Sequence, residues 1–203
     1  MSVPHGEHVL LIGSGNPGKQ REWRELLAGL DAVLLVPQDL DPPPPEPEEN
    51  GETFEANAIH KARAYAVASG MRAVADDSGL AVDALRGAPG IRSRRFFGDD
   101  ASAEERNTRL LALLDGVQER GARFVCVAAL ASPDGRVEIF DGEVRGEIAL
   151  APRGAEGFGY DPLFVIAGDG RTMAELPSEE KHRISHRGLA AAKVRARLAE
   201  EPR

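Results

Sequence analysis

The glycine-rich turn Gly13-Ser14-Gly15-Asn16-Pro17-Gly18 restricts the possible folds of this chain more than any other segment. It follows Val9–Ile12, a continuous apolar run that is typical of a strand buried on both faces. Residues 19–30 repeat apolar side chains at helical spacing, and residues 32–36 have the pattern of a second strand. Such a strand–turn–helix–strand unit predicts an α/β protein.

The next segments predict a long loop, a helix and a short strand. Residues 37–52 contain six of the 14 prolines of the chain, four of them in a row, so we expect an extended loop there. Thr53 has the character of a helix cap, and small or apolar side chains recur at helical spacing as far as Ser69. Ala73–Ala75 is expected to be a short strand that ends in Asp76-Asp77-Ser78-Gly79.

The second half of the chain predicts antiparallel strands and two further helices. Ser102 begins a capping box that opens a helix, and Ser132-Pro133-Asp134-Gly135 has the composition of a hairpin turn. Further strands are expected at residues 124–131, 136–140, 143–150 and 163–166, and a last helix at residues 189–198. The sheet is therefore expected to be mixed, parallel at the start and antiparallel later.

The charge and the single cysteine restrict the partners and the compartment. The formal net charge is -8, which makes a nucleic acid polymer a poor partner, because phosphate neutralisation dominates that affinity. Cys126 is the only cysteine, so an intrachain disulfide is excluded and a reducing compartment fits. The first apolar run is too short to span a bilayer and has no basic leader, so we expect a cytoplasmic protein without a membrane partner.

Two known patterns fit the first turn. Glycines at positions 13, 15 and 18, between a strand and a helix, are typical of a dinucleotide-binding fold, which leaves a dinucleotide-binding oxidoreductase as one alternative. The same stretch through Lys19 matches a P-loop, but Gln20 stands where that loop needs a magnesium-binding hydroxyl. Both patterns place small residues and a lysine at a helix N-terminus, so we expect Ser14–Lys19 to bind a phosphate group.

Asp76 and Asp77 form a second candidate site. Adjacent residues at a strand end point to opposite sides, so only one aspartate needs to face a cleft and the other can cap a turn at Gly79. A carboxylate at this edge of an open α/β sheet can hold magnesium or accept a proton from an attacking water. Ser78 could bind a phosphate through its hydroxyl or backbone groups.

Two later segments contain residue types that bind nucleotides. The loop Gly157-Phe158-Gly159-Tyr160-Asp161-Pro162 offers two aromatic rings and a carboxylate, and aromatic rings stack on nucleobases. Lys181 and the pair His186-Arg187 offer donors near the start of the last helix, where an anion or a carbonyl oxygen could bind. Taken singly, each segment fits an ordinary loop or a capped surface helix better than a ligand site.

Together and in this order, these motifs resemble those of the inosine triphosphate pyrophosphatase family, which acts on noncanonical purine nucleoside triphosphates. The resemblance runs over residues 9–198, nearly the whole chain. Its pieces are Ser14-Gly15-Asn16-Pro17-Gly18-Lys19 with Glu22, Glu49 with Gly51 to Ala58 and Lys61-Ala62, Ala75 to Leu80, Gly87-Ala88-Pro89-Gly90, Gly157 to Pro162, and Lys181 to Arg187.

This resemblance implies an elongated α/β protein with a mixed central sheet flanked by helices, and two lobes around a central substrate cleft. It implies a homodimeric, Mg²⁺-dependent enzyme that cleaves ITP, dITP and XTP to the monophosphate and pyrophosphate. Asp77 would be the catalytic acceptor and, with Glu49, a metal ligand. Ser14–Lys19 and Ser78 would bind the phosphates. The base pocket would consist of Phe158, Gly159, Tyr160, Asp161, Lys181, His186 and Arg187.

The expected organisation is a single two-lobed domain over residues 1–203, with a loose tail at residues 1–7 and the proline-rich loop at residues 37–52. Arg94, Arg95 and Lys61 receive no role. A non-catalytic nucleotide sensor could use the same pocket, and only magnesium-dependent turnover distinguishes it from an enzyme. The oxidoreductase alternative accounts for the first turn but leaves Asp77 and the later motifs without a function.

Overall fold

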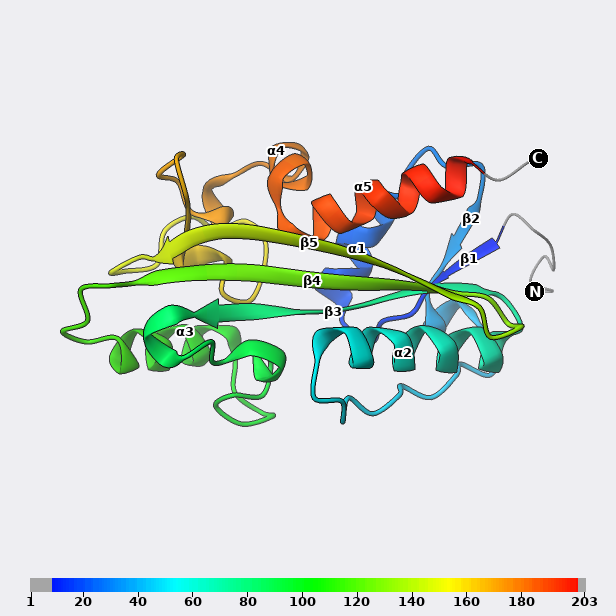
Figure 1. Cartoon of the computed structure of the whole chain (residues 1–203), viewed down its shortest axis with the longest axis horizontal. Coiled ribbons are helices and arrows are strands. Elements are labelled where there is room, and N and C mark those ends of the chain that lie inside the picture. Colours follow the sequence, from blue (N-terminus) through cyan, green and yellow to red (C-terminus); the bar gives the residue numbers. More distant parts are fainter. Residues whose placement is uncertain (1–8, 201–203) are drawn as a thin grey trace. The chain divides into compact units, whose positions relative to one another are not determined.

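A computed structural model describes residues 9–200 of the chain (Figure 1). The predicted tail at residues 1–7 lies outside the described residues. The strands are β1 (Val9–Ile12), β2 (Val33–Leu35), β3 (Arg72–Val82), β4 (Gly121–Ala131), β5 (Val137–Ile148) and β6 (Phe164–Ile166). The α-helices are α1 (Pro17–Leu26), α2 (Phe54–Ser69), α3 (Ala103–Leu113), α4 (Ser178–Ile184) and α5 (His186–Ala199).

The six strands form one sheet in the order β2-β1-β3-β4-β5-β6. β1 pairs in parallel with both β2 and β3, whereas β5 and β6 are antiparallel. A short turn joins β4 to β5, with the Ser132 N–H donating to the Arg136 carbonyl at 2.9 Å. The prediction of a mixed α/β sheet flanked by helices is therefore confirmed.

The chain divides into two compact units. Unit 1 consists of Met1–Asp77, Val127–Asp141 and Ala190–Arg203, and unit 2 of Ser78–Cys126 and Gly142–Leu189. The boundary crosses β3, β4 and β5, so each of these strands contributes residues to both units. The single domain and the central substrate cleft stay predictions.

Unit 1 is built by helices on both faces of its strands. One face packs on α2, where small side chains such as Ala58 and Ala62 meet Ala73 and Ala75 of β3. Figure 1 shows α1 and α5 on the opposite face, and the Arg195 guanidinium of α5 donates to the Leu26 carbonyl at the end of α1 at 3.1 Å. Because side chains alternate along a strand, consecutive residues of β3 therefore face different helices.

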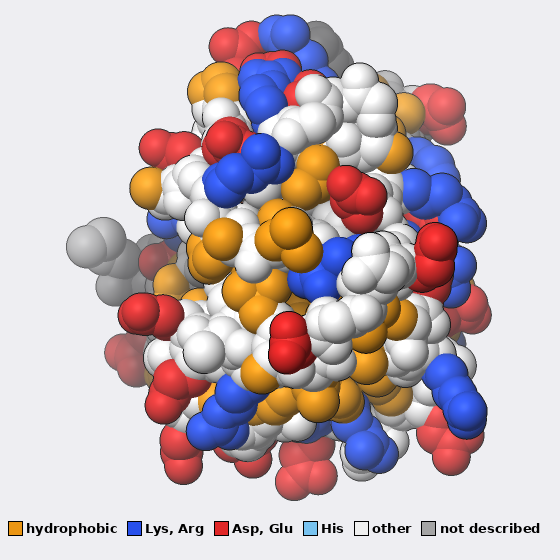
Figure 2. Space-filling model, turned by 90° about the vertical axis from the view of Figure 1, so that its left-hand side faces the viewer, with side chains coloured by type: hydrophobic (Ala, Val, Ile, Leu, Met, Phe, Trp, Pro, Cys, Tyr) orange, Lys and Arg blue, Asp and Glu red, His pale blue; other side chains and the backbone are white. Residues whose placement is uncertain are grey.

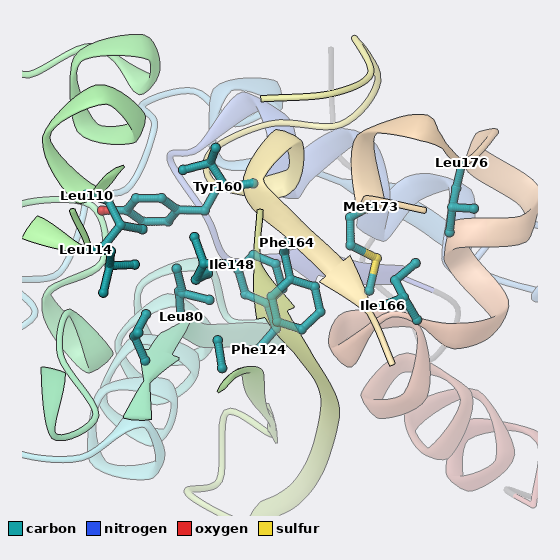
Figure 3. Close-up of a cluster of buried hydrophobic side chains, with 13 residues drawn as sticks. Leu80, Leu110, Leu114, Phe124, Ile148, Tyr160, Phe164, Ile166, Met173 and Leu176 are labelled. Atoms are coloured by element: carbon teal, nitrogen blue, oxygen red, sulfur yellow. The ribbon is translucent and has the colours of Figure 1, made fainter. Parts of the chain in front are cut away.

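The core of unit 2 is made of larger apolar side chains. Leu80 of β3, Phe124 of β4 and Ile148 of β5 pack with residues of α3, β6 and the loop before β6 (Figure 3). The rings of Phe124 and Phe164 lie with their centroids 4.6 Å apart. Tyr160 is also part of this core and is 5% exposed. Burial of this apolar surface is the main favourable term in the folding of the unit.

The third strand is longer than predicted, which changes the position of the two aspartates. β3 extends from Arg72 to Val82, so Asp76 and Asp77 lie in its middle and Gly79 is a strand residue. The expected strand end and the turn at Gly79 are wrong. A Cβ at Gly79 would lie 2.3 Å from the Gly90 carbonyl oxygen, so glycine here permits a close approach of two backbones. In the sequence alone, the same glycine has the pattern of a turn.

Smaller differences affect the helices and the later strands. The predicted helix over residues 19–30 ends at Leu26, and Gly29 has a left-handed φ of 80°. The two strands expected at residues 136–140 and 143–150 are one continuous strand, β5. Helix α4 was not predicted, and the proline-rich loop begins with a short 3-10 turn at Pro37–Asp39.

The described surface carries charges of both signs. In Figure 2, acidic and basic side chains are interspersed with apolar ones over the face that is shown. Within residues 9–200, every helix falls short of the length and apolar character needed to cross a membrane.

Candidate active site

The first turn is organised by Asn16, which caps α1. The Asn16 side-chain oxygen accepts from the backbone N–H groups of Gly18 at 2.9 Å and Lys19 at 3.2 Å, and Pro17 occupies the first helical position. The Asn16 N–H in turn donates to the Ser14 hydroxyl at 3.2 Å. Two of the N–H groups expected to face a phosphate are thus engaged in the cap, and the Lys19 ammonium and the helix dipole are left as the main attractions for an anion.

The glycines of this turn are required by close neighbours. A Cβ at Gly13 would lie 2.6 Å from the ring of Tyr65 on α2. A Cβ at Gly15 would lie 2.4 Å from a carboxylate oxygen of Glu46, which comes from the proline-rich loop. The two glycines therefore permit close packing of the turn against α2 and against the proline-rich loop.

Lys19 reaches from the turn to β3. Its ammonium lies 3.0 Å from Oδ2 of Asp76 and donates to the Asp76 backbone carbonyl at 3.1 Å. The Lys19 side chain is 13% exposed, whereas the Asp76 side chain is fully buried. The structure thus brings the predicted phosphate-binding lysine to the aspartate pair, through Asp76.

Asp77 faces α2 and belongs to a group of four polar residues that we call the Asp77 cluster: Glu49, Asn57, Lys61 and Asp77. The Asn57 amide donates to Oδ2 of Asp77 at 2.8 Å, and Asn57 is 1% exposed. The Lys61 ammonium lies 3.9 Å from Oδ1 of Asp77 and forms an ion pair with Glu49. Asn57 also accepts from the Gly51 N–H at 2.8 Å, which holds the loop that carries Glu49.

Burial dominates the ionisation of Asp77. Burial raises the pKa of its carboxyl above the ordinary value, although Lys61, Lys19 and the hydrogen bond from Asn57 oppose the rise. Burial would lower the pKa of Lys61, but Asp77, Glu49 and Asp76 outweigh it, so the pKa of this ammonium is raised. Lys61 therefore stays charged, while Asp77 is a stronger base than an exposed aspartate.

The Asp77 cluster fits a divalent cation. Carboxylate oxygens of Asp77 and Glu49 both approach one positive charge, the Lys61 ammonium. Among residues 9–200, no three His, Cys, Asp or Glu side chains gather closely enough to hold a metal alone. Two carboxylates suit Mg²⁺, which is held in proteins by one or two carboxylates together with substrate phosphates.

The later motifs meet in unit 2, in a group that we call the Phe158 cluster: Ser78, Phe158, Asp161, Lys181 and Arg187. Oδ2 of Asp161 accepts from the Lys181 ammonium at 2.7 Å and from the Phe158 N–H at 2.8 Å. The Lys181 ammonium and the Arg187 guanidinium lie 5.4 and 5.5 Å from the centre of the Phe158 ring. These contacts fix the loop and surround its aromatic ring with positive charge.

Arg187 and His186 are positioned by the start of α5. The Arg187 guanidinium donates to the Ser78 hydroxyl at 2.8 Å, which places Ser78 beside the predicted base pocket. The His186 ring stacks on Phe124 with centroids 4.7 Å apart and planes inclined by 14°. Both side chains are buried, so their donors are held in fixed positions.

Tyr160 does not present a ring for stacking, contrary to the prediction of two aromatic faces. Its ring lies in the core of unit 2 and its hydroxyl donates to the Ser93 carbonyl at 3.0 Å, while burial raises its pKa to about 12. The Asp161 carboxylate is also buried and engaged by Lys181 and the Phe158 N–H. Phe158 is the ring that the loop leaves partly exposed, so Tyr160 and Asp161 support the loop.

Several residues have a place in the site that the sequence did not assign. Asn57 and Lys61 are four residues apart on one face of α2, a spacing that was visible in the motif but could not be connected to Asp77. Asp76 was expected to face a cleft or cap a turn, and instead contacts Lys19. Arg94 and Arg95 are exposed on their loop and receive no role from the structure.

Comparison with known sequences identifies relatives over nearly the whole chain. The model of the Ham1 family matches residues 10–197. A dITP/XTP pyrophosphatase of Geobacter sulfurreducens is 49% identical over 191 residues, which cover 93% of this chain and 96% of that protein. A dITP/XTP pyrophosphatase of Deinococcus deserti is 49% identical over 187 residues, covering 92% of this chain and 88% of the relative.

Solved structures agree with this result. A HAM1 protein from Coxiella burnetii is 41% identical, with a TM-score of 0.85 and coverage of 95% of this chain and 99% of that structure. A nucleoside-triphosphatase / dITP/XTP pyrophosphatase from Mycobacterium abscessus is 44% identical, with a TM-score of 0.70 and coverage of 92% and 98%. The resemblance inferred from the motifs is confirmed: the chain belongs to the Ham1 family.

Proposed function

We propose that this protein is a nucleoside triphosphate pyrophosphatase that hydrolyses noncanonical purine nucleotides, dITP, XTP and ITP, to the monophosphate and pyrophosphate. Relatives that are 49% identical over more than nine tenths of the chain are dITP/XTP pyrophosphatases. In the structure, the buried Asp77 carboxylate, with its raised pKa and its hydrogen bond from Asn57, is the observation that carries the assignment of a catalytic site.

The triphosphate is assigned to the turn Ser14–Lys19 and to the Asp77 cluster. The whole chain carries a net charge of -8, so a polyanionic substrate requires local positive charge, which Lys19 and Lys61 provide. Asp77 and Glu49 would hold Mg²⁺, whose charge would neutralise phosphate oxygens and make the phosphorus easier to attack. Ser78 is assigned to the phosphates as well, with its hydroxyl oriented by Arg187.

Asp77 is proposed as the proton acceptor. A water attacks the α-phosphorus and its proton passes to the Asp77 carboxylate, while the bond from this phosphorus to the bridging oxygen breaks and pyrophosphate leaves. The Asn57 amide holds Oδ2 of Asp77 in place, and Oδ1, which lies 3.9 Å from the Lys61 ammonium, would accept the proton. General bases of this kind contribute about 10²- to 10⁴-fold to the rate.

The purine is assigned to the members of the Phe158 cluster other than Ser78, together with His186. The Phe158 ring can stack on a base, and the rigid loop around it prepares that contact. Hypoxanthine and xanthine carry a carbonyl oxygen where adenine has an amino group, and donors of His186 and Arg187 suit the oxygen. A site of this polarity can reject the mismatched base by about 10⁴-fold, because buried donors are left unpaired.

The experiment is a substrate panel. Release of pyrophosphate is measured with ITP, dITP, XTP, ATP and GTP, each with and without magnesium. We expect magnesium-dependent turnover of the first three and little of ATP. Equal rates with all five would contradict the specificity, and binding without any turnover would favour a nucleotide sensor. NAD(P) in the purified protein would favour the oxidoreductase.

The homodimer and the cytoplasmic location stay predictions. Light scattering after size-exclusion chromatography measures the mass directly, and a mass of twice 21.7 kDa is expected. A monomer at all concentrations would contradict the dimer without affecting the proposed chemistry.

A further inference from the structure

Asp76 is a buried carboxylate that the reaction as described above does not use. It is 1% exposed and lies on the face of β3 opposite to Asp77, which belongs to the α2 side. Its Oδ1 accepts from the indole N–H of Trp23 at 2.8 Å, and Trp23 is fully buried. A carboxylate held in this way has little freedom to move.

The second oxygen of Asp76 holds Lys19. Oδ2 lies 3.0 Å from the Lys19 ammonium, and the same ammonium donates to the Asp76 backbone carbonyl at 3.1 Å. An ammonium has three N–H donors, so these contacts occupy two and leave a third for a phosphate oxygen. Lys19 is therefore oriented by two groups of one residue.

We propose that Asp76 is the positioning residue for Lys19, and that Trp23 fixes Asp76. Asp76 does not touch the substrate; it holds the Lys19 ammonium at the phosphate-binding turn before the nucleotide arrives. A free lysine side chain loses rotamer entropy when it is immobilised, and a lysine that is already immobilised avoids that loss on binding. The inference rests on the proposed role of Lys19 in binding the triphosphate.

The alternative is that Asp76 only stabilises the fold. Both views predict that replacing Asp76 lowers stability, because a buried ion pair loses one partner. They differ in whether the loss of activity depends on Lys19. A double-mutant cycle measures that dependence.

The cycle compares wild type, Asp76→Asn, Lys19→Met and the double variant, with kcat and KM for ITP in saturating magnesium. Circular dichroism and thermal unfolding establish that each variant is folded at the assay temperature. We expect Asp76→Asn to lower kcat/KM by about 10- to 100-fold in the presence of Lys19. In the Lys19→Met background we expect the same substitution to change kcat/KM by less than about 2-fold.

Two further variants complete the design. Trp23→Phe removes the indole donor and keeps an aromatic ring. Its loss of kcat/KM should also require Lys19, which a second cycle of Trp23→Phe with Lys19→Met measures. If Asp76→Asn does not fold, this second cycle tests the proposal by itself. Asp141→Asn is the matched control, because it breaks another aspartate–lysine pair, with Lys193 at 2.7 Å on the exposed surface. We expect it to keep full activity.

Each outcome has one meaning. Equal fold losses from Asp76→Asn with and without Lys19 would overturn the positioning role and leave a structural one. Full activity of Lys19→Met would instead overturn the proposed role of Lys19 in phosphate binding. A loss of kcat/KM on Asp76→Asn that occurs only when Lys19 is present would support both the positioning role of Asp76 and the phosphate-binding role of Lys19.

Discussion

Asp76 and Asp77 have different surroundings although one peptide bond joins them. The alternation of side chains in β3 directs Asp77 to Asn57 and Lys61 on α2, and Asp76 to Trp23 and Lys19. One strand thus places the proposed proton acceptor on one face and, on the other, the aspartate that contacts Lys19.

The raised pKa of Asp77 predicts a pH-dependent gain in stability for Asp77→Asn. The folded state disfavours the ionised carboxylate relative to the unfolded chain, where the pKa is near 3.8. In magnesium-free buffer, the free energy of unfolding of wild type should therefore fall relative to that of Asp77→Asn as pH rises from about 3.8 through the raised pKa. Urea unfolding at a series of pH values measures both.

The same variant should lose activity by about 10²- to 10⁴-fold. A folded Asp77→Asn protein with nearly full turnover would remove Asp77 from the mechanism. If the difference in free energy of unfolding between wild type and Asp77→Asn does not change with pH, the pKa of Asp77 is not raised in the folded state.

Two aspartate–lysine pairs of equal length provide a test of burial. Lys181–Asp161 and Lys193–Asp141 are both 2.7 Å long, but the side chains are 4% and 5% exposed in the first pair and 52% and 77% in the second. Lys181→Met should cost about 3–5 kcal/mol of stability, because it leaves a buried carboxylate without its ammonium. Lys193→Met should cost no more than about 1 kcal/mol. Chemical denaturation measures the two values, and similar values would contradict this account.

At the scale of elements, the length of β3 depends on its contact with the loop that follows it. The Leu80 N–H donates to the Ser93 hydroxyl at 2.8 Å, and that hydroxyl donates to the Gly90 carbonyl at 2.6 Å. The Ser93 carbonyl in turn accepts from Tyr160, in the loop of the Phe158 cluster. The strand, this loop and the loop that carries Phe158 are therefore connected by hydrogen bonds within unit 2.

Gly79→Ala tests this close packing. A Cβ at Gly79 would lie 2.3 Å from the Gly90 carbonyl oxygen and 2.5 Å from the Ser93 hydroxyl, so backbone must move. We expect a loss of about 1–3 kcal/mol in urea unfolding. Gly121→Ala is the control in β4, where a Cβ would meet only the mobile end of Asp83 at 2.7 Å, and we expect a change within about 0.5 kcal/mol. Equal losses of stability in the two variants would show that the close approach of the Gly90 carbonyl does not restrict residue 79 to glycine.

At the scale of the whole molecule, the charge argues against polymeric nucleic acid. The net charge of the chain is -8, and acidic and basic side chains are interspersed on the face shown in Figure 2, whereas proteins that bind a phosphate backbone carry clustered basic side chains. Fluorescence anisotropy should detect no binding of duplex DNA at about 0.15 M salt. Binding of DNA that weakens steeply with salt would contradict this prediction.

The motifs and most elements were predictable because they depend on local sequence. Strand β1 and the capped helices α2 and α3 follow from periodicity and capping residues, whereas the roles of the site residues came from the resemblance of the motifs to a known family. The sequence also assigned the family, since six motifs occur in one order. It placed the strand end at Ala75, because Asp and Gly are residues that usually end strands.

Only the tertiary structure determined which residues each of these side chains contacts and how deeply each is buried. Whether Asp76 or Asp77 faces α2, whether Tyr160 is stacked or buried, and where β3 ends all depend on partners distant in the chain, such as Asn57, Ser93 and Trp23. A residue's local pattern determines its conformation and its alternating direction. Its burial and its charge partners are set by which segments fold against it, and those contacts determine its chemistry.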